Sequence, residues 1–175
     1  MRKLVMGLLS VLMVACFAAV VVAQGNPRGT STLTLKGKTV SVDYGRPSLK
    51  GRTTDELLGR LKPGSLWRLG ADSSTTFKTD IDLAFGGVTI PAGEYSIWMQ
   101  RQEDNSWKLL FDKDHGQWGE PAPEASACFA SVPLKETKPA TSVEMVTLTL
   151  SKAGSGGMLL IQWGTLEAAA SFKAK

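Results

Sequence analysis

One short segment holds the side chains that hydrolases use most often. It reads Asp112-Lys113-Asp114-His115-Gly116 and contains the only histidine of the chain. A carboxylate beside a histidine can activate a nucleophile, so a hydrolase that uses Asp112, Asp114 or His115 is one hypothesis. The sequence has no Gly-x-Ser-x-Gly nucleophile elbow, and the alternative interpretation makes His115 a solvated turn residue.

The same segment superficially resembles a calcium-binding loop. Its glycine, Gly116, comes one place too early for that loop, and Pro123 stands where the closing glutamate should be. With one histidine and two cysteines in the whole chain, zinc and copper lack the N and S ligands that they need. We therefore expect no metal and no cofactor.

Tryptophan is frequent, with five residues in the chain. Trp98, Trp107 and Trp163 fall within strand-like patterns and are expected in the core. Trp67 and Trp118 fall at the edges of loops that also carry arginine, a combination that stacks on flat ligands or anchors an interface. The alternative is that both rings cap the ends of the domain.

Alternating apolar residues predict the strands that would position these side chains. Val40, Val42 and Tyr44 occupy one face of residues 39–44, and Val146, Leu148 and Leu150 do so in 143–151. A period of two with β-branched and aromatic residues is typical of half-buried strands. Together with turn residues at regular spacing, it predicts an all-β fold, an antiparallel β-sandwich or barrel.

About ten strands are expected, and one short helix. The helix is predicted at residues 54–58 within a long loop, 45–63, because acidic residues precede Leu57-Leu58 and Gly59 follows. The remaining predicted strands are 32–35, 67–69, 75–78, 83–85, 88–90, 94–101, 107–112, 127–132, 158–163 and 166–172.

The first 23 residues predict a secretory signal peptide. Arg2 and Lys3 precede an uncharged apolar run that ends at Ala23, which is the pattern of a cleaved signal. An uncleaved anchor is the first alternative, because the run is about long enough to cross a bilayer. The second is a lipoprotein anchored through an acylated Cys16. The chain is expected to be exported, to the periplasm or the extracellular space, and to touch a membrane only if Cys16 is lipidated or the signal is retained.

Residues 24–175 have the size of a single domain. Of the chain's 20 basic residues two lie in the predicted signal, which leaves 18 against 16 acidic residues. That balance is too small to predict nucleic-acid binding. Cys128 would be the one remaining cysteine and is expected to be a small buried hydrophobe, so the core must stabilise the domain without an internal disulfide.

Four motifs, in order along the chain, carry a family resemblance. They are Tyr44-Gly45-Arg46-Pro47-Ser48-Leu49-Lys50-Gly51-Arg52, then Leu66-Trp67-Arg68-Leu69-Gly70-Ala71-Asp72 running into Thr75-Thr76-Phe77, then Ile90-Pro91-Ala92-Gly93-Glu94-Tyr95-Ser96, and Phe111-Asp112-Lys113-Asp114 followed by Gln117-Trp118-Gly119. Their order and spacing resemble a bacterial family of exported domains of unknown function, DUF2911. Two positions depart from the family pattern: Gly45 stands where serine is usual, and Asp72 where asparagine is usual.

The resemblance implies a mostly β, exported domain and no particular activity. It also draws attention to seven residues of these motifs as a candidate ligand site: Arg46, Lys50, Arg52, Trp67, Arg68, Asp72 and Trp118. Arg46 and Arg68 could instead pair with acids such as Asp72 and hold the long loop in place.

Our leading hypothesis is therefore a non-catalytic binding or interaction domain of the cell envelope. Its partner is unknown, with an envelope glycan or an envelope protein as the candidates. The alternatives are the hydrolase described above and a purely structural envelope protein.

Overall fold

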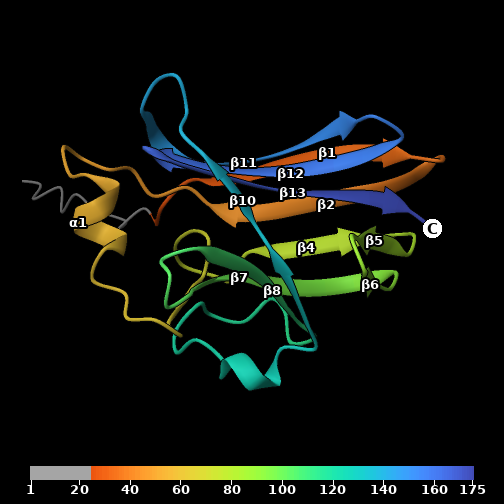
Figure 1. The fold of residues 1–175 in the computed structure, drawn as a ribbon, viewed down its shortest axis with the longest axis horizontal. Coiled ribbons are helices and arrows are strands. Elements are labelled where there is room, and N and C mark those ends of the chain that lie inside the picture. Colours follow the sequence, from red (N-terminus) through yellow and green to blue (C-terminus); the bar gives the residue numbers. More distant parts are fainter. Residues whose placement is uncertain (1–24) are drawn as a thin grey trace, which may run out of the picture.

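The structure is a computed structural model that describes residues 25–175. The predicted signal peptide and Cys16 lie outside the described residues. Within residues 25–175, no helix is long and apolar enough to span a membrane. The described chain forms two antiparallel sheets stacked face to face (Figure 1), so the predicted all-β sandwich is confirmed.

The first sheet has seven strands, all antiparallel to their neighbours. Its order is β1 (Arg28–Leu35), β2 (Lys38–Gly45), β4 (Thr76–Thr79), β7 (Gly93–Arg101), β8 (Trp107–Asp112) and β9 (Ala130–Pro133), with β3 (Leu66–Trp67) pairing to the far end of β7.

The second sheet has six strands. Its order is β11 (Val143–Ala153), β12 (Gly156–Gly164), β13 (Leu166–Ala174), β5 (Leu83–Phe85) and β6 (Val88–Ile90), and β10 (Lys135–Thr137) pairs with β13. Figure 1 shows β10 crossing from one layer to the other after β9. At one edge of the sandwich the Ser31 hydroxyl accepts a hydrogen bond from the Leu150 backbone N–H, at 2.9 Å. This bond joins β1 to β11 across the two sheets.

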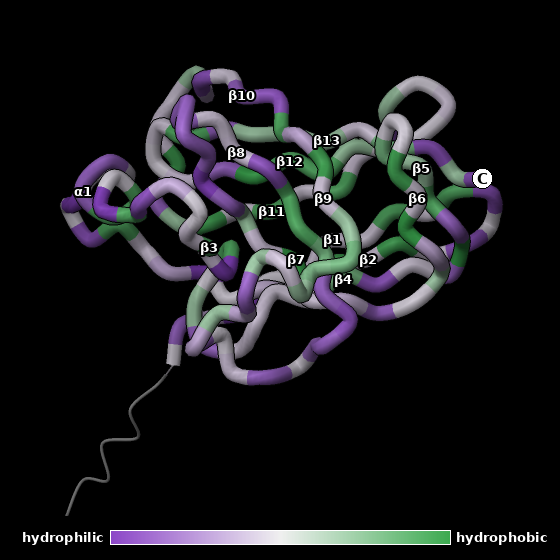
Figure 2. The backbone as a smooth tube through the Cα atoms, turned by 60° about the horizontal axis from the view of Figure 1, so that its bottom comes forward, coloured by the Kyte–Doolittle hydropathy of each residue, from purple (hydrophilic) through white to green (hydrophobic). Residues whose placement is uncertain are grey.

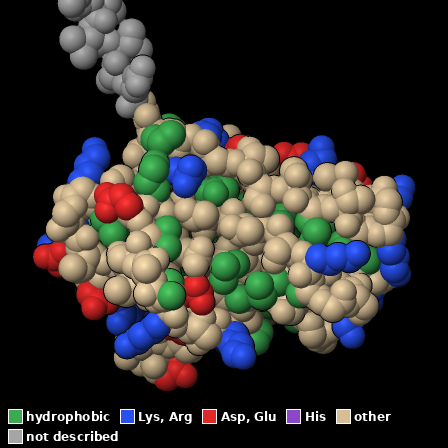
Figure 3. Space-filling view, turned by 90° about the horizontal axis from the view of Figure 1, so that it is seen from above, with side chains coloured by type: hydrophobic (Ala, Val, Ile, Leu, Met, Phe, Trp, Pro, Cys, Tyr) green, Lys and Arg blue, Asp and Glu red, His purple; other side chains and the backbone are tan. Residues whose placement is uncertain are grey.

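The core lies between the sheets because alternate residues of each strand face inward. Val40 and Val42 of β2 and Val146 and Leu148 of β11 are all buried, as their spacing predicts. Figure 2 shows hydrophobic segments along the strands and hydrophilic ones in the turns and around α1. Viewed from above, charged side chains lie mainly around the rim of the molecule (Figure 3). Burial of this apolar surface is the main force that holds the two sheets together.

A second apolar layer covers the outer side of the first sheet. Trp98 is 1% exposed but points away from the central core, since its neighbours Ile97 and Met99 belong to that core. Its indole N–H donates to the Ser96 hydroxyl at 2.9 Å. In Figure 1 the chain between β8 and β9, with its short 3-10 helix at Ala125–Ala127, lies below β7 and β8. Strands β7 and β8 are therefore covered on both faces.

The predicted helix is present, as α1 (Thr54–Leu58). The Thr53 hydroxyl accepts from the Glu56 N–H at 3.2 Å, and the Glu56 carboxylate accepts from the Thr53 N–H at 2.6 Å. This reciprocal pair is a capping box, and it satisfies two backbone donors that a helix start leaves unpaired. The helix therefore begins where its own residues cap it.

Three predicted strand boundaries were wrong, and one strand was missed. The expected strand at 32–35 begins already at Arg28. The expected strand at 67–69 ends at Trp67, because Leu69 has a positive φ of 57°. The expected strand at 127–132 begins only at Ala130, after the 3-10 helix. Strand β10 was not predicted, since its three residues are all exposed and show no apolar alternation. The described residues contain thirteen strands, one for each of the twelve predicted ranges and β10 in addition.

Candidate functional site

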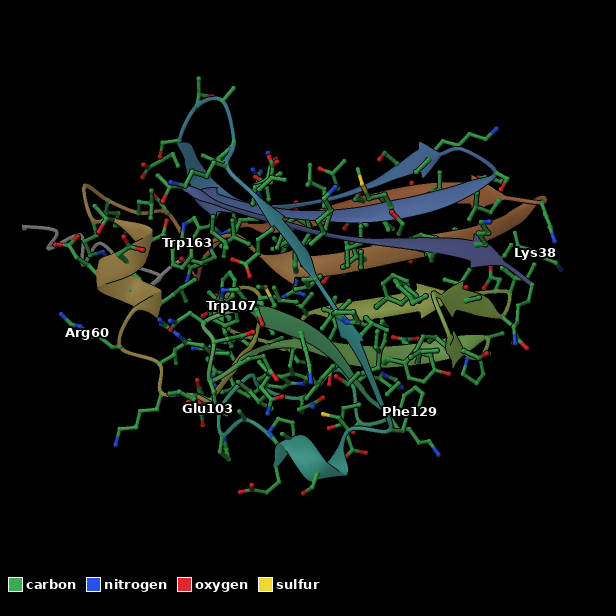
Figure 4. All side chains as sticks on the ribbon, in the orientation of Figure 1. Lys38, Arg60, Glu103, Trp107, Phe129 and Trp163 are labelled. Carbon is green, nitrogen blue, oxygen red and sulfur yellow. The ribbon has the colours of Figure 1, made fainter. Side chains whose placement is uncertain are left out.

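A hollow of about 650 Å³ opens at the end of the sandwich that carries α1. Its walls come from α1, the β7–β8 hairpin, β10 with the residue after it, and the β12–β13 turn. The lining residues are Thr54, Asp55, Leu58, Gly59, Arg101, Asn105, Trp107, Glu136, Thr137, Lys138, Thr165 and Leu166. Figure 4 shows Trp107 between α1 and β10, near this end. A hollow of this size is in the range of small-molecule sites.

The first wall is fixed because α1 is bonded to the β12–β13 turn. The buried Thr54 hydroxyl donates to the Trp163 carbonyl at 2.9 Å and accepts from the Thr165 N–H at 3.2 Å. The close approach requires glycine at 164, where φ is +56° and an added Cβ would lie 1.9 Å from the Thr54 hydroxyl oxygen. The helix therefore stands at a defined place against the second sheet.

The second wall presents a guanidinium held by three hydrogen bonds. Arg101, the last residue of β7, donates from Nη1 to the Leu58 carbonyl at 3.1 Å. Its Nε and Nη2 both donate to Asn105 Oδ1, at 3.2 and 2.8 Å. Asn105 sits in the hairpin turn with a φ of +66°, a conformation that asparagine adopts more readily than most residues. The charge of Arg101 is thus pre-positioned between α1 and the hairpin.

The third wall is formed by β10, which lies beside Trp107. Glu136 projects from β10, and the Thr137 hydroxyl donates to Glu167 Oε1 at 2.5 Å. Although much of Glu136 is exposed, partial burial of its carboxyl raises its pKa. The backbone N–H of Trp107 opposes this shift, and the negative charge of Asp104 adds to it. A carboxyl with a raised pKa beside a cleft is a common feature of ligand sites.

The seven residues singled out from the sequence do not line this hollow. Three of them brace the long loop. Arg46 donates to the Val146 carbonyl at 3.2 Å, and Arg52 to the Leu49 carbonyl at 2.9 Å. Lys50, with a φ of +51°, donates its backbone N–H to Glu144 at 2.9 Å. These contacts join the loop to β11 and to itself.

Trp67 lies in the core and not at an exposed loop edge. It is 9% exposed, and its ring stacks on that of Trp163 with the ring centroids 5.5 Å apart and the planes 15° apart. The Trp163 indole N–H is buried and has no hydrogen-bond partner among the described residues. The stacked rings of Trp67 and Trp163 thus fill the core at the end of the sandwich that carries α1.

Arg68, Asp72 and Trp118 lie near one another, where residues 68–75 meet 117–120. The Asp72 carbonyl accepts from the Gly119 N–H at 2.9 Å, and Ser73 forms a β-bridge with Trp118. Among the described residues, Arg46 and Arg68 do not pair with Asp72, the acid named as an example in the prediction. The carboxylate of Asp72 accepts instead from the Asn26 backbone N–H at 2.9 Å.

Arg68 faces a different acid, since its guanidinium lies 3.7 Å from the Glu120 carboxylate. Trp118 is 60% exposed, the largest exposed fraction of any large hydrophobic side chain among residues 25–175. Of the seven predicted ligand residues, Trp118 is therefore the one whose ring is open to a partner. The role of the seven as ligand contacts stays a prediction.

Among the described residues, the side chains of Asp112, Asp114 and His115 do not bond to one another. Asp112 is buried and accepts from the Asp114 backbone N–H at 3.2 Å. His115 Nδ1 lies 3.5 Å from Glu94 Oε1. Among residues 25–175, no three His, Cys, Asp or Glu side chains gather as a metal site would require. His115 and Asp112 therefore do not form the histidine–carboxylate pair that a catalytic triad needs.

Cys128 is half-buried and unpaired in the described chain. Burial raises the pKa of its thiol to about 11, and the negative charge of Asp112 adds to the shift. A thiol with such a pKa is protonated at neutral pH and is a poor nucleophile.

The sequence pattern did not single out the residues of the hollow. They come from four segments far apart in the chain, and Glu136 and Lys138 belong to a stretch without alternation. One signal was present: Arg101 and Trp107 flank a polar turn at the end of a predicted hairpin. Such turns bring the two flanking side chains close together at one end of a sheet.

Comparison with known proteins gives one match. The family model described as "Protein of unknown function (DUF2911)" matches residues 26–172. No curated protein matches the chain, and no solved structure does. The chain belongs to the DUF2911 family, and the resemblance of the four motifs is confirmed.

Proposed function

We propose that this member of the DUF2911 family is an exported, non-catalytic binding domain of the cell envelope, with its ligand site in the hollow beside α1. Export is supported by the signal-like pattern of residues 1–23. The pre-positioned guanidinium of Arg101 is the observation that carries the binding proposal. Three hydrogen bonds, two to Asn105 Oδ1 and one to the Leu58 carbonyl, hold it at the wall of a hollow of about 650 Å³.

A fixed polar group at the wall of a hollow favours binding because little side-chain entropy is lost when the ligand arrives. Arg101 is held by the carbonyl of α1 and by the amide of Asn105. The hollow also joins apolar surface from Leu58 and Leu166 to charged groups, the combination that is usual in small-molecule sites.

Trp118 is a second contact of the same binding domain in this proposal. Its ring is exposed, and the backbone beneath it is held by the bridge to Ser73. Arg68 and Asp72 lie beside it. An exposed, well-supported tryptophan is a frequent anchor of protein interfaces.

The test is a nitrogen-15 NMR titration of the protein recovered after export. Mixtures of neutral sugars, amino acids, small carboxylates and amines are added at millimolar concentration. The proposal expects amide shifts at Arg101, Asn105 and Lys138 with at least one mixture. The variant Arg101→Gln should weaken that response, and Arg60→Gln is the matched control.

Arg60 suits the control because it lies just after α1, is exposed and does not line the hollow. Figure 4 shows its side chain directed away from the sandwich. If no mixture moves the amides around the hollow, the binding proposal is wrong for this site. Shifts confined to Trp118 and its neighbours would move the site to that surface.

A further inference from the structure

The charged side chains of the hollow balance one another. Arg101 and Lys138 are basic, and Asp55 and Glu136 are acidic. A lining with equal numbers of both charges produces no strong field of one sign. A small anion or cation that enters the hollow therefore meets repulsion as well as attraction, and the charge of the lining does not select an ion.

The guanidinium of Arg101 is also unsuited to gripping a carboxylate or a phosphate from its side edge. Arginine binds these groups best through two parallel N–H bonds from one edge. In this structure Nε and Nη2 both donate to Asn105 Oδ1, so that edge is occupied. Since Nη1 also donates to Leu58, two of the five guanidinium N–H groups remain for a ligand.

The remaining polar groups match hydroxyls. A hydroxyl donates one hydrogen bond and accepts others, so it can donate to Asp55 or Glu136 while it accepts from Arg101 or Lys138. The lining of the hollow supplies both kinds of group, two acids and two bases. Hydrogen bonds between a neutral hydroxyl and an ionised group are stronger than neutral ones.

The hollow also has apolar surface for the C–H side of a sugar ring. Leu58 of α1, Leu166 of β13 and part of Trp107 lie on its lining. The hydroxyls of Thr54 and Thr137 already donate to Trp163 and Glu167, so the threonines add surface more than ligand contacts. Apolar walls with a few fixed polar groups are the usual composition of a site for a neutral polar ligand.

Resting on the proposed binding function, we infer that the hollow beside α1 binds a short saccharide. The charged groups contact its hydroxyls, and Leu166, which is half-buried, contacts a ring face together with the small exposed parts of Leu58 and Trp107. In this inference the Glu136 carboxylate, on β10, accepts a hydrogen bond from one of the saccharide hydroxyls.

The inference is tested by calorimetry and NMR with named probes. The saccharides are maltotriose, cellotriose and triacetylchitotriose. The ionic probes are glutamate, the dipeptide Ala-Glu, inorganic phosphate and spermidine. We expect at least one trisaccharide to bind, with amide shifts at Arg101, Asn105 and Lys138, and no comparable response to the ionic probes.

The variant Glu136→Gln should weaken binding of that saccharide about tenfold or more, because a charge-assisted hydrogen bond is lost. Glu103→Gln is the matched control, since Glu103 is exposed in the adjacent hairpin turn and does not line the hollow. Figure 4 shows Glu103 below Trp107, away from α1. Equal affinity of the Glu136→Gln variant and the wild type would overturn the role of Glu136.

The outcomes separate this inference from the proposed function. If glutamate, Ala-Glu, phosphate or spermidine binds in the hollow and no saccharide does, the ligand class is wrong while the binding function stands. If no probe and no mixture of the earlier titration moves these amides, both are wrong. A saccharide that shifts only the amides around Trp118 would overturn the placement in the hollow.

Discussion

Replacement of Trp67 by alanine tests whether the predicted ligand tryptophans have a structural role. Trp67 is 9% exposed and stacks on Trp163 with the centroids 5.5 Å apart. Removal of a buried tryptophan typically costs about 3–5 kcal/mol, and a stacked aromatic pair contributes about 0.5–1.5 kcal/mol of that. We therefore expect Trp67→Ala to lower the free energy of unfolding by about 3–5 kcal/mol, a large part of the stability of a small domain.

The measurement is urea unfolding followed by far-ultraviolet circular dichroism, which does not depend on tryptophan emission. The change is taken from the transition midpoint at constant m, because a constant m shows that the same surface is exposed in both proteins. The matched control is Trp118→Ala. Since Trp118 is 60% exposed, its removal should change the free energy of unfolding by less than about 0.5 kcal/mol.

The result that refutes this reasoning is a cost below about 1 kcal/mol for Trp67→Ala. It would mean that the ring does not close the core as described. The expected result has a practical consequence for binding studies. Loss of binding in a Trp67 variant would report unfolding, whereas loss in Trp118→Ala would report a lost contact.

Two further predictions concern the α1 end of the sandwich. Gly164→Ala should destabilise the protein by clearly more than Gly154→Ala, by urea unfolding. Both glycines have a φ of +56°, but only at Gly164 would the new Cβ clash, 1.9 Å from the Thr54 hydroxyl; equal costs would show that the backbone conformation alone is responsible. Glu136→Gln should gain stability relative to the wild type as pH rises from about 4 to about 7. The partly buried carboxyl has a raised pKa, so the folded wild type binds that proton more tightly than the unfolded chain and loses stability as it deprotonates. Unfolding at each pH checks the sign, and a difference that does not vary with pH would contradict it.

Strands with one buried face could be predicted because their side chains alternate. Val40 and Val42, like Val146 and Leu148, are buried as the pattern requires. The pattern fails where burial does not alternate. Strand β10 is exposed along its whole length, so only its pairing with β13 makes it a strand.

The position of Trp67 could not be predicted from its neighbours in sequence. It precedes Arg68 and a residue with positive φ, Leu69, which together suggest an exposed loop edge. Its burial depends on Trp163, almost one hundred residues later in the chain. The hollow was missed for the same reason, because the four chain segments that line it come together only after both sheets have formed.

Much of the lining of the hollow comes from exposed polar residues outside the core, although Leu58 and Trp107 of the lining belong to the core. The hairpin turn around Asn105, the segment after β10 and the exposed face of α1 are polar and lie at the ends of strands. Substitutions there change the shape and charge of the hollow while the packing between the sheets is preserved. The lining of the hollow can therefore change without a change in the fold, while α1 stays fastened to the second sheet through Thr54.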